Sequence, residues 1–82
     1  MITVVAFKTK FSEIVSMSPE EIHDDTQLDS LIEWDSLAMV GMAALLFEIS
    51  QTTSTADEIT ELKTFKDLVS LAYAKGGIEN AE

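Results

Sequence analysis

The amino-acid sequence predicts an all-α fold: a small four-helix bundle with three longer helices, one short helix and a long first loop. Apolar residues recur at helical spacing through most of the chain. Ser or Thr residues stand just before several of these segments, and in two cases a Glu follows three positions later, which is typical of a helix start. The middle of the chain also holds a long apolar run without Pro, which favours a nearly buried helix.

The length and composition fit one domain. With 82 residues, of which 46% are hydrophobic, the chain is close to the smallest size at which a core suffices on its own. It contains no Cys, so disulfides and zinc–thiolate sites are excluded. We expect a single domain over residues 1–82, with a core at about 2–75 and a flexible tail at 76–82.

Residues 2–16 predict an amphipathic helix. Its apolar positions are spaced to line one helix face, and they are Phe7, Phe11, Ile14 and Val15. A second, short helical turn is expected to begin after Ser18, because Pro19 suits the first helical position and Glu21 is placed for a capping box.

A long loop at residues 24–34 follows this turn. Leu28 and Leu31 are expected to anchor the loop to the core, and Ile22 to be buried just before it. Connections of this length are uncommon in small bundles and usually have a function. Trp34, near its end, is interpreted either as an anchor of the loop or as a substrate contact.

The middle helix is predicted over residues 36–50, where Glu48 is the only charged residue. A helical projection gives it a core face of Val40, Ala43 and Phe47, flanked by Met39 and Leu46. The same projection gives it an outer face of Leu37, Ala38, Gly41, Leu45 and Glu48. We expect this outer face to be a mostly apolar strip that docks partners, unless a loop or a dimer mate covers it.

Two further helices are predicted after a polar loop at residues 51–55. Thr55 and Glu58 form a capping box for a short helix that contains Ile59 and Leu62. The last helix starts at Thr64 and stops at Gly76-Gly77, with Lys75 suited to the negative end of its dipole. Its inward residues are expected to be Phe65, Leu68, Val69 and Ala72.

The charge of the chain restricts its partners. A net charge of −10, from 15 acidic and 5 basic residues, argues against nucleic acid as a ligand. The stretch from Glu13 to Asp35 is rich in acids and has no Lys or Arg. It is either a solvated surface or a means of steering a basic enzyme. No stretch has the length of a membrane span and no basic leader is present, so we expect a cytoplasmic monomer.

Ser36 stands where the acidic loop meets the apolar helix. Ser and Asp are favoured helix caps, so capping alone would explain the pair Asp35-Ser36. A helix start also favours phosphate, through its unpaired N–H groups and the positive end of its dipole. The Ser36 hydroxyl is therefore also a good place to carry a phosphodiester.

Two other kinds of site fit the sequence poorly. A calcium loop at residues 24–35 needs oxygen ligands at its third and fifth positions and Gly at its sixth, where the chain has Thr26, Leu28 and Asp29. A hydrolase built on Ser36 and His23 lacks the Gly-x-Ser-x-Gly elbow. We therefore predict no metal site and no catalytic residue, and we expect His23 on the surface.

Two segments carry a family resemblance. The segment Ile32-Glu33-Trp34-Asp35-Ser36-Leu37 resembles the attachment motif of acyl carrier proteins and related phosphopantetheine-binding domains. Residues 61–69, Glu-Leu-Lys-Thr-Phe-Lys-Asp-Leu-Val, are similar to the start of the last helix in that family. The resemblance covers roughly residues 2–75. It implies that Ser36 carries 4′-phosphopantetheine and that Asp35 helps to orient a metal-bound cofactor donor.

The resemblance implies a non-catalytic carrier that holds an acyl cargo as a thioester. It implies three partners: a phosphopantetheinyl transferase, an acyl- or aminoacyl-loading ligase, and a downstream transferase or synthase. Carriers of fatty-acid synthesis usually bear several outer acids on the second helix, where this chain has Ala38, Gly41 and Phe47, so a specialised pathway is favoured. Two alternatives stay open: an aminoacyl or peptidyl carrier of the same fold, and an unmodified acidic interaction module in which Ser36 is only a cap.

The space between the middle helix and the later helices is the expected place for an inserted acyl chain. Small residues, chiefly Ala43 and Ala44, leave room there. Ordinary core packing is the alternative interpretation. The residues expected to line this space are Val40, Ala43, Phe47, Ile59, Leu62 and Leu68.

Overall fold

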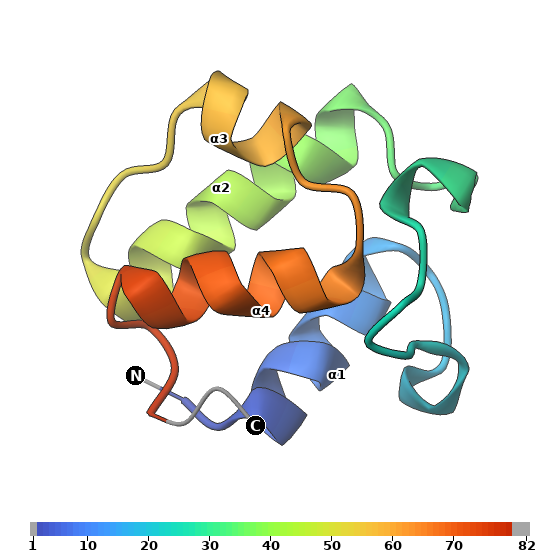
Figure 1. The fold of residues 1–82 in the computed structure, drawn as a ribbon, viewed down its shortest axis with the longest axis horizontal. Helices are drawn as coiled ribbons and strands as arrows, with labels where there is room; N and C mark the ends of the chain where they lie inside the picture. Colours follow the sequence, from blue (N-terminus) through green and yellow to red (C-terminus); the bar gives the residue numbers. More distant parts are fainter. Residues whose placement is uncertain (1, 80–82) are drawn as a thin grey trace.

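The chain folds into four α-helices in a computed structural model that describes residues 2–79 (Figure 1). The α-helices are α1 (Val4–Ile14), α2 (Ser36–Ser50), α3 (Ala56–Thr60) and α4 (Phe65–Ala74). Two short 3₁₀ helices, η1 (Pro19–Glu21) and η2 (Leu28–Ser30), lie between α1 and α2. Helix α3 has 5 residues, whereas the others have 11, 15 and 10. The predicted all-α bundle of three longer helices and one short helix is therefore confirmed.

The two last helices begin at capping boxes, of which the sequence analysis predicted the one at Thr55 and Glu58 but not the one at Thr64 and Asp67. At α3, the Glu58 N–H donates to Thr55 Oγ1 at 3.1 Å, and the Thr55 N–H donates to Glu58 Oε1 at 2.9 Å. At α4, the Asp67 N–H donates to Thr64 Oγ1 at 3.2 Å, and the Thr64 N–H donates to Asp67 Oδ2 at 3.1 Å. Each box pairs backbone N–H groups that would otherwise lack partners, which fixes where the helix starts.

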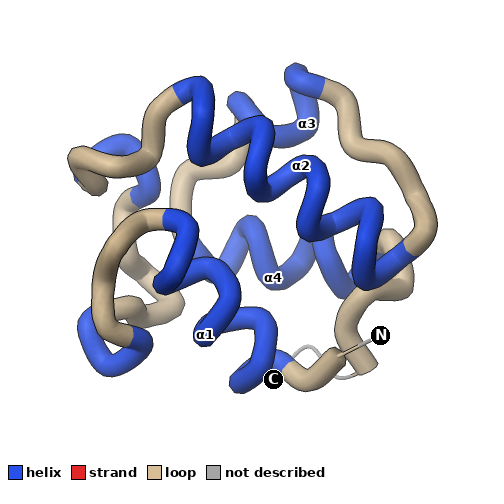
Figure 2. The backbone as a smooth tube through the Cα atoms, turned by 180° about the vertical axis from the view of Figure 1, so that it is seen from behind, coloured by secondary structure: helices blue, strands red, loops and turns tan. Residues whose placement is uncertain are grey.

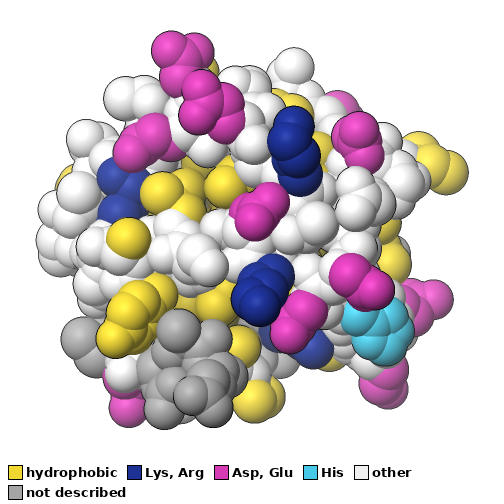
Figure 3. All heavy atoms as spheres, viewed as in Figure 1, with side chains coloured by type: hydrophobic (Ala, Val, Ile, Leu, Met, Phe, Trp, Pro, Cys, Tyr) yellow, Lys and Arg dark blue, Asp and Glu magenta, His cyan; other side chains and the backbone are white. Residues whose placement is uncertain are grey.

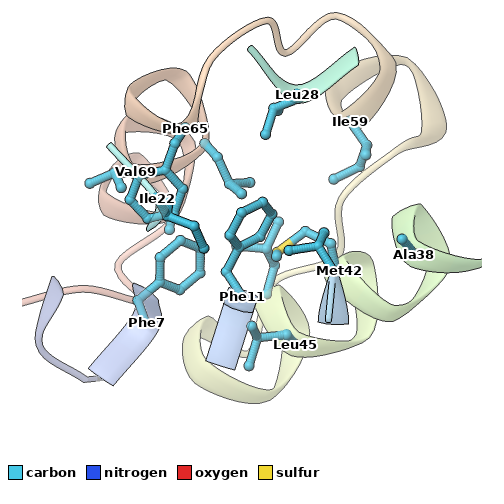
Figure 4. Close-up of a cluster of buried hydrophobic side chains, with 14 of the residues drawn as sticks. Phe7, Phe11, Ile22, Leu28, Ala38, Met42, Leu45, Ile59, Phe65 and Val69 are labelled. Carbon is cyan, nitrogen blue, oxygen red and sulfur yellow. The ribbon is translucent and has the colours of Figure 1, made fainter. Parts of the chain in front are cut away.

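Three aromatic rings form the centre of the core between α1 and α4. The Phe7 and Phe11 rings of α1 lie on Phe65 of α4, with ring centroids 6.1 Å and 5.2 Å apart. All three side chains are fully buried. Figure 4 shows the Met42 side chain of α2 pointing toward Phe11, so α2 closes the core from the third side. Each such large apolar side chain stabilises the fold by about 1.5–3 kcal/mol.

The predicted orientation of α2 is wrong at four positions, although Leu46 is buried as expected. Val40 and Phe47, expected in the core, are 66% and 48% exposed, whereas Ala38 and Leu45, expected outside, are 6% and 7% exposed. Helix α2 is apolar on almost every side, so its hydrophobic periodicity cannot single out one face. Figure 4 shows Leu45 directed into the core. The buried residues of α2 are Ala38, Met42, Leu45, Leu46 and Ile49.

The long first loop is anchored to the connection between α3 and α4, far away in the sequence. The Leu28 N–H donates to the Lys63 carbonyl at 2.8 Å, and the Phe65 N–H donates to the Thr26 carbonyl at 3.0 Å. Leu28 and Ile22 are buried, as predicted, and Leu31 is partly buried against the core. Figure 2 shows this loop passing around the end of α1 before α2 begins. The loop therefore holds the start of α2 in place.

The predicted flexible tail is wrong for residues 76–79. Ile78 is 2% exposed and forms a parallel bridge with Ile2. The Ile2 N–H donates to the Gly77 carbonyl at 3.0 Å. Gly77 also packs so closely on Ile49 that a Cβ there would lie 2.7 Å from Ile49 Cγ1. The core thus extends beyond its predicted end, and the last three residues of the predicted tail lie outside the described residues.

Candidate functional site

Ser36 is the first residue of α2, and its side chain is exposed. The residue that caps the helix is Asp35, whose backbone is extended and whose Oδ1 accepts the Ala38 N–H at 2.9 Å. The cap of the pair Asp35-Ser36 is therefore Asp35, which leaves the Ser36 hydroxyl without a capping role. The structure brings the two predicted cofactor-binding residues together at the solvent-exposed start of one helix.

Replacing Asp35 with alanine should destabilise the fold. The loss of an Asp cap typically lowers the free energy of unfolding by about 0.5–2 kcal/mol. We expect urea unfolding of Asp35→Ala to show a loss in this range. Asp35→Asn is the matched control, because Asn caps a helix about as well as Asp. An equally large loss in Asp35→Asn would mean that the charge, and not the cap, stabilises α2.

The indole of Trp34 anchors the segment that precedes the site. Its side chain is 9% exposed and lies on Phe11, with ring centroids 5.9 Å apart. The backbone N–H of Trp34 donates to the Leu31 carbonyl at 3.1 Å. The interpretation of Trp34 as an anchor is confirmed, because a ring buried against α1 cannot also cover a substrate. The backbone leading to Ser36 is thereby fixed to the core.

An apolar groove begins at Ser36 and lies between α2 and α3, which are neighbours in Figure 1. It is open to solvent and has a volume of about 370 Å³. Val40, Ala43 and Ile59 line it as predicted, whereas Phe47, Leu62 and Leu68 do not. The complete lining is Ser36, Met39, Val40, Ala43, Ser54, Thr55, Ala56, Ile59 and Thr60.

The outer side of α2 carries several exposed apolar side chains, which we call the outer strip: Leu37, Val40, Ala44 and Phe47. Leu37 and Val40 are 79% and 66% exposed. These residues recur at spacings of three and four, so they follow one side of the helix away from Ser36. Exposed apolar side chains that form a continuous patch mark a candidate interaction surface.

The outer strip differs from the predicted docking strip. Leu37 and Glu48 are exposed and Gly41 is partly exposed, as expected for that strip. Ala38 and Leu45 are buried, so they cannot contact a partner in the folded state. The three residues of the outer strip that the sequence reasoning missed are Val40, Ala44 and Phe47. They have the i, i+4, i+7 spacing of a helix face, but apolar residues at this spacing also suit a buried face.

The surroundings of Ser36 are strongly acidic. Glu33 and Asp35 precede it and are exposed, as are Asp24, Asp25 and Asp29 of the long loop and Glu20 and Glu21 of η1. Within residues 2–79, the one ion pair joins Lys75 to Glu58, so the loop acids have no lysine partner. Figure 3 shows acidic side chains spread over one face of the molecule, with lysines among them. His23 is exposed, as predicted.

The described part of the chain contains neither a metal cluster nor a membrane span. No group of three or more His, Asp or Glu side chains among residues 2–79 is arranged to hold a metal ion. None of the helices in this range has both the length and the hydropathy needed to cross a bilayer. Comparison of the chain with protein-family models, curated proteins and solved structures finds no match. The candidate site is therefore an exposed alcohol at a helix start, beside an apolar groove.

Proposed function

We propose that this chain is an acyl carrier protein with 4′-phosphopantetheine attached to Ser36. The observation that carries this proposal is that the exposed Ser36 hydroxyl and the apolar groove begin at the same residue. The resemblance of residues 32–37 to the attachment motif supports the same assignment. The arm is joined to Ser36 Oγ as a phosphodiester, and its terminal thiol holds the cargo as a thioester.

The start of α2 suits each part of this attachment. Its unpaired N–H groups and the positive end of its dipole favour the phosphate of the arm. Asp35 Oδ1 already accepts the Ala38 N–H, which leaves Oδ2 to orient a metal-bound cofactor donor during attachment. A chain without Cys has no thiol of its own, so the arm supplies the group that carries the cargo.

The cargo in this proposal is an acyl group for a specialised pathway. The groove is mostly apolar, which favours a hydrocarbon chain over the polar cargo of an aminoacyl or peptidyl carrier. Its size is within the usual range of small-molecule sites. The partners are a phosphopantetheinyl transferase, a loading ligase and a downstream transferase or synthase. The carrier itself is a cytoplasmic monomer with no catalytic activity.

Intact-mass measurement tests the attachment. The purified chain is incubated with coenzyme A, Mg²⁺ and a broad-range phosphopantetheinyl transferase, and its mass is compared with that of a sample lacking the transferase. We expect the mass of a single arm to be added. An unchanged mass would favour the alternative of an acidic interaction module that is never modified.

Thermal melting of acylated forms tests whether the cargo enters the groove. An acyl chain that buries about 100 Å² of apolar surface in the groove raises the free energy of unfolding by at most ~2.5 kcal/mol. We therefore expect the octanoyl form to melt several degrees above the form with a free thiol. In Ala43→Leu the larger side chain narrows the groove, so the octanoyl form should no longer melt above the form with a free thiol. Equal melting midpoints in all forms of the unsubstituted chain would contradict insertion.

A further inference from the structure

Lys75, which follows the last residue of α4, contacts the side of the groove that lies opposite α2. We call this side, residues 54–60, the wall. Its Nζ lies 3.3 Å from Glu58 Oε1 in α3 and donates to the Thr53 carbonyl at 3.1 Å. The Lys75 side chain is 13% exposed and that of Glu58 is 40% exposed, so Lys75 is held against the protein while its carboxylate partner meets water. Hydrogen bonds from the Thr55 backbone and then from Lys75 lower the pKa of Glu58, which is therefore ionised at neutral pH. One ammonium group thus joins α4, α3 and the loop before α3.

Besides Lys75, the wall is held by the buried Ile59 side chain and by the connection after α3, whose Lys63 carbonyl accepts the Leu28 N–H. Five residues of the wall line the groove. Helix α3 has 5 residues, of which only Ile59 is buried. A helix of this length is not stable by itself, so its position depends on its tertiary contacts. The Thr55–Glu58 capping box is local to α3, and it therefore cannot fix where α3 lies relative to α2.

One buried group in this wall is unsatisfied. Ser54 Oγ is buried and has no hydrogen-bond partner within residues 2–79. Thr53, whose carbonyl accepts from Lys75 Nζ, is the neighbour of Ser54 in the chain, so Lys75 holds the backbone at this point of the wall.

We infer that Lys75 is the positioning residue that sets the width of the groove and thereby limits the length of acyl chain that it accepts. Without the ammonium, the Thr53 carbonyl and the Glu58 carboxylate lose their common partner. Because α3 is too short to be stable by itself, it then moves away from α2 and unfolds locally more often. The statement about acyl chains rests on the proposed function, whereas the statement about the wall does not.

Hydrogen exchange on the unmodified chain tests the effect on the wall. The informative amides are those of Glu58, Ile59 and Glu61, which are hydrogen-bonded within or next to α3. We expect Lys75→Met to speed their exchange about tenfold, as expected for the loss of one charge-assisted hydrogen bond. Lys66→Met is the matched control, because Lys66 lies exposed in α4 and its replacement removes the same charge.

Lys75→Arg should restore slow exchange, because arginine keeps the charge and can reach the same oxygens. Equal exchange in Lys75→Met and Lys66→Met would overturn the inference. Because this experiment needs no arm on Ser36, its result stands even if intact mass shows that the chain is never modified. A failure of the wall hypothesis and a failure of the carrier hypothesis are thus distinguishable.

A series of acyl chains tests the effect on the cargo. Chains from butanoyl to dodecanoyl are loaded on the arm, and the melting midpoint is recorded for each length. In the unsubstituted protein, the gain in midpoint should stop rising at one chain length. In Lys75→Met the gain in midpoint should keep rising to longer acyl chains. In Lys66→Met it should stop at the same acyl length as in the unsubstituted protein. The same limiting length in Lys75→Met, despite faster exchange, would refute the role in cargo selection.

Discussion

Replacing Ser36 with alanine is expected to abolish attachment of the phosphopantetheine arm and with it all carrier activity. The proposal makes Ser36 Oγ the only atom that bonds to the arm, so no partial activity should survive. The fold should be retained, because Asp35 and not Ser36 caps α2 and the Ser36 side chain is exposed. We expect the free energy of unfolding to change by no more than about 0.5 kcal/mol.

Two measurements on the same sample check this result. Intact mass after incubation with the transferase reports attachment, and urea unfolding reports stability. Ser30→Ala is the matched control, since Ser30 is also exposed and lies in the loop that leads to the site. The control should gain one arm at the rate of the unsubstituted protein. A Ser36→Ala protein that still gains the arm would place the attachment site elsewhere.

The sequence predicted those parts of the fold that depend on neighbouring residues. Helix starts are of this kind, since a capping box such as Thr55 with Glu58 is complete within four residues. The predicted bounds of α2, residues 36–50, match the structure for the same reason. The pairing of Ile2 with Ile78 is different, because it joins the two ends of the chain and no local pattern reports it.

One part of the candidate site, the helix start at Ser36, depends on neighbouring residues and was predicted from the sequence. Its position at Ser36 follows from a local motif at a helix start. The buried face of α2 does not, because a helix that is apolar all round is oriented by what α1 and α4 present to it. The Lys75 contacts with α3 and its loop also escape sequence reasoning, since Lys75 and Thr53 are 22 positions apart.

Leu45→Glu is expected to destabilise the fold severely, by more than about 3 kcal/mol, because it places an unpaired charge in the core. The outward orientation predicted from the sequence would instead have made it a mild surface change. Leu37→Glu, at a position that is 79% exposed, should leave the unfolding midpoint almost unchanged. Urea unfolding of both variants separates these outcomes. Similar stability of Leu45→Glu and Leu37→Glu would contradict the buried face of α2.

Leu37→Glu and Phe47→Glu, each first checked for folding by urea unfolding, then test partner docking, since neither residue lines the groove. If the outer strip contacts the phosphopantetheinyl transferase, both should lower the rate of arm transfer even at high salt, because apolar contacts act mainly on dissociation. Neutralising Asp24, Asp25 and Asp29 should lower the rate mostly at low salt, because steering charges act on association and are screened by ions. Leu37, next to Ser36, should have the larger effect of the two strip residues. Equal losses from both sets of variants at every ionic strength would contradict this division between steering acids and an apolar contact surface.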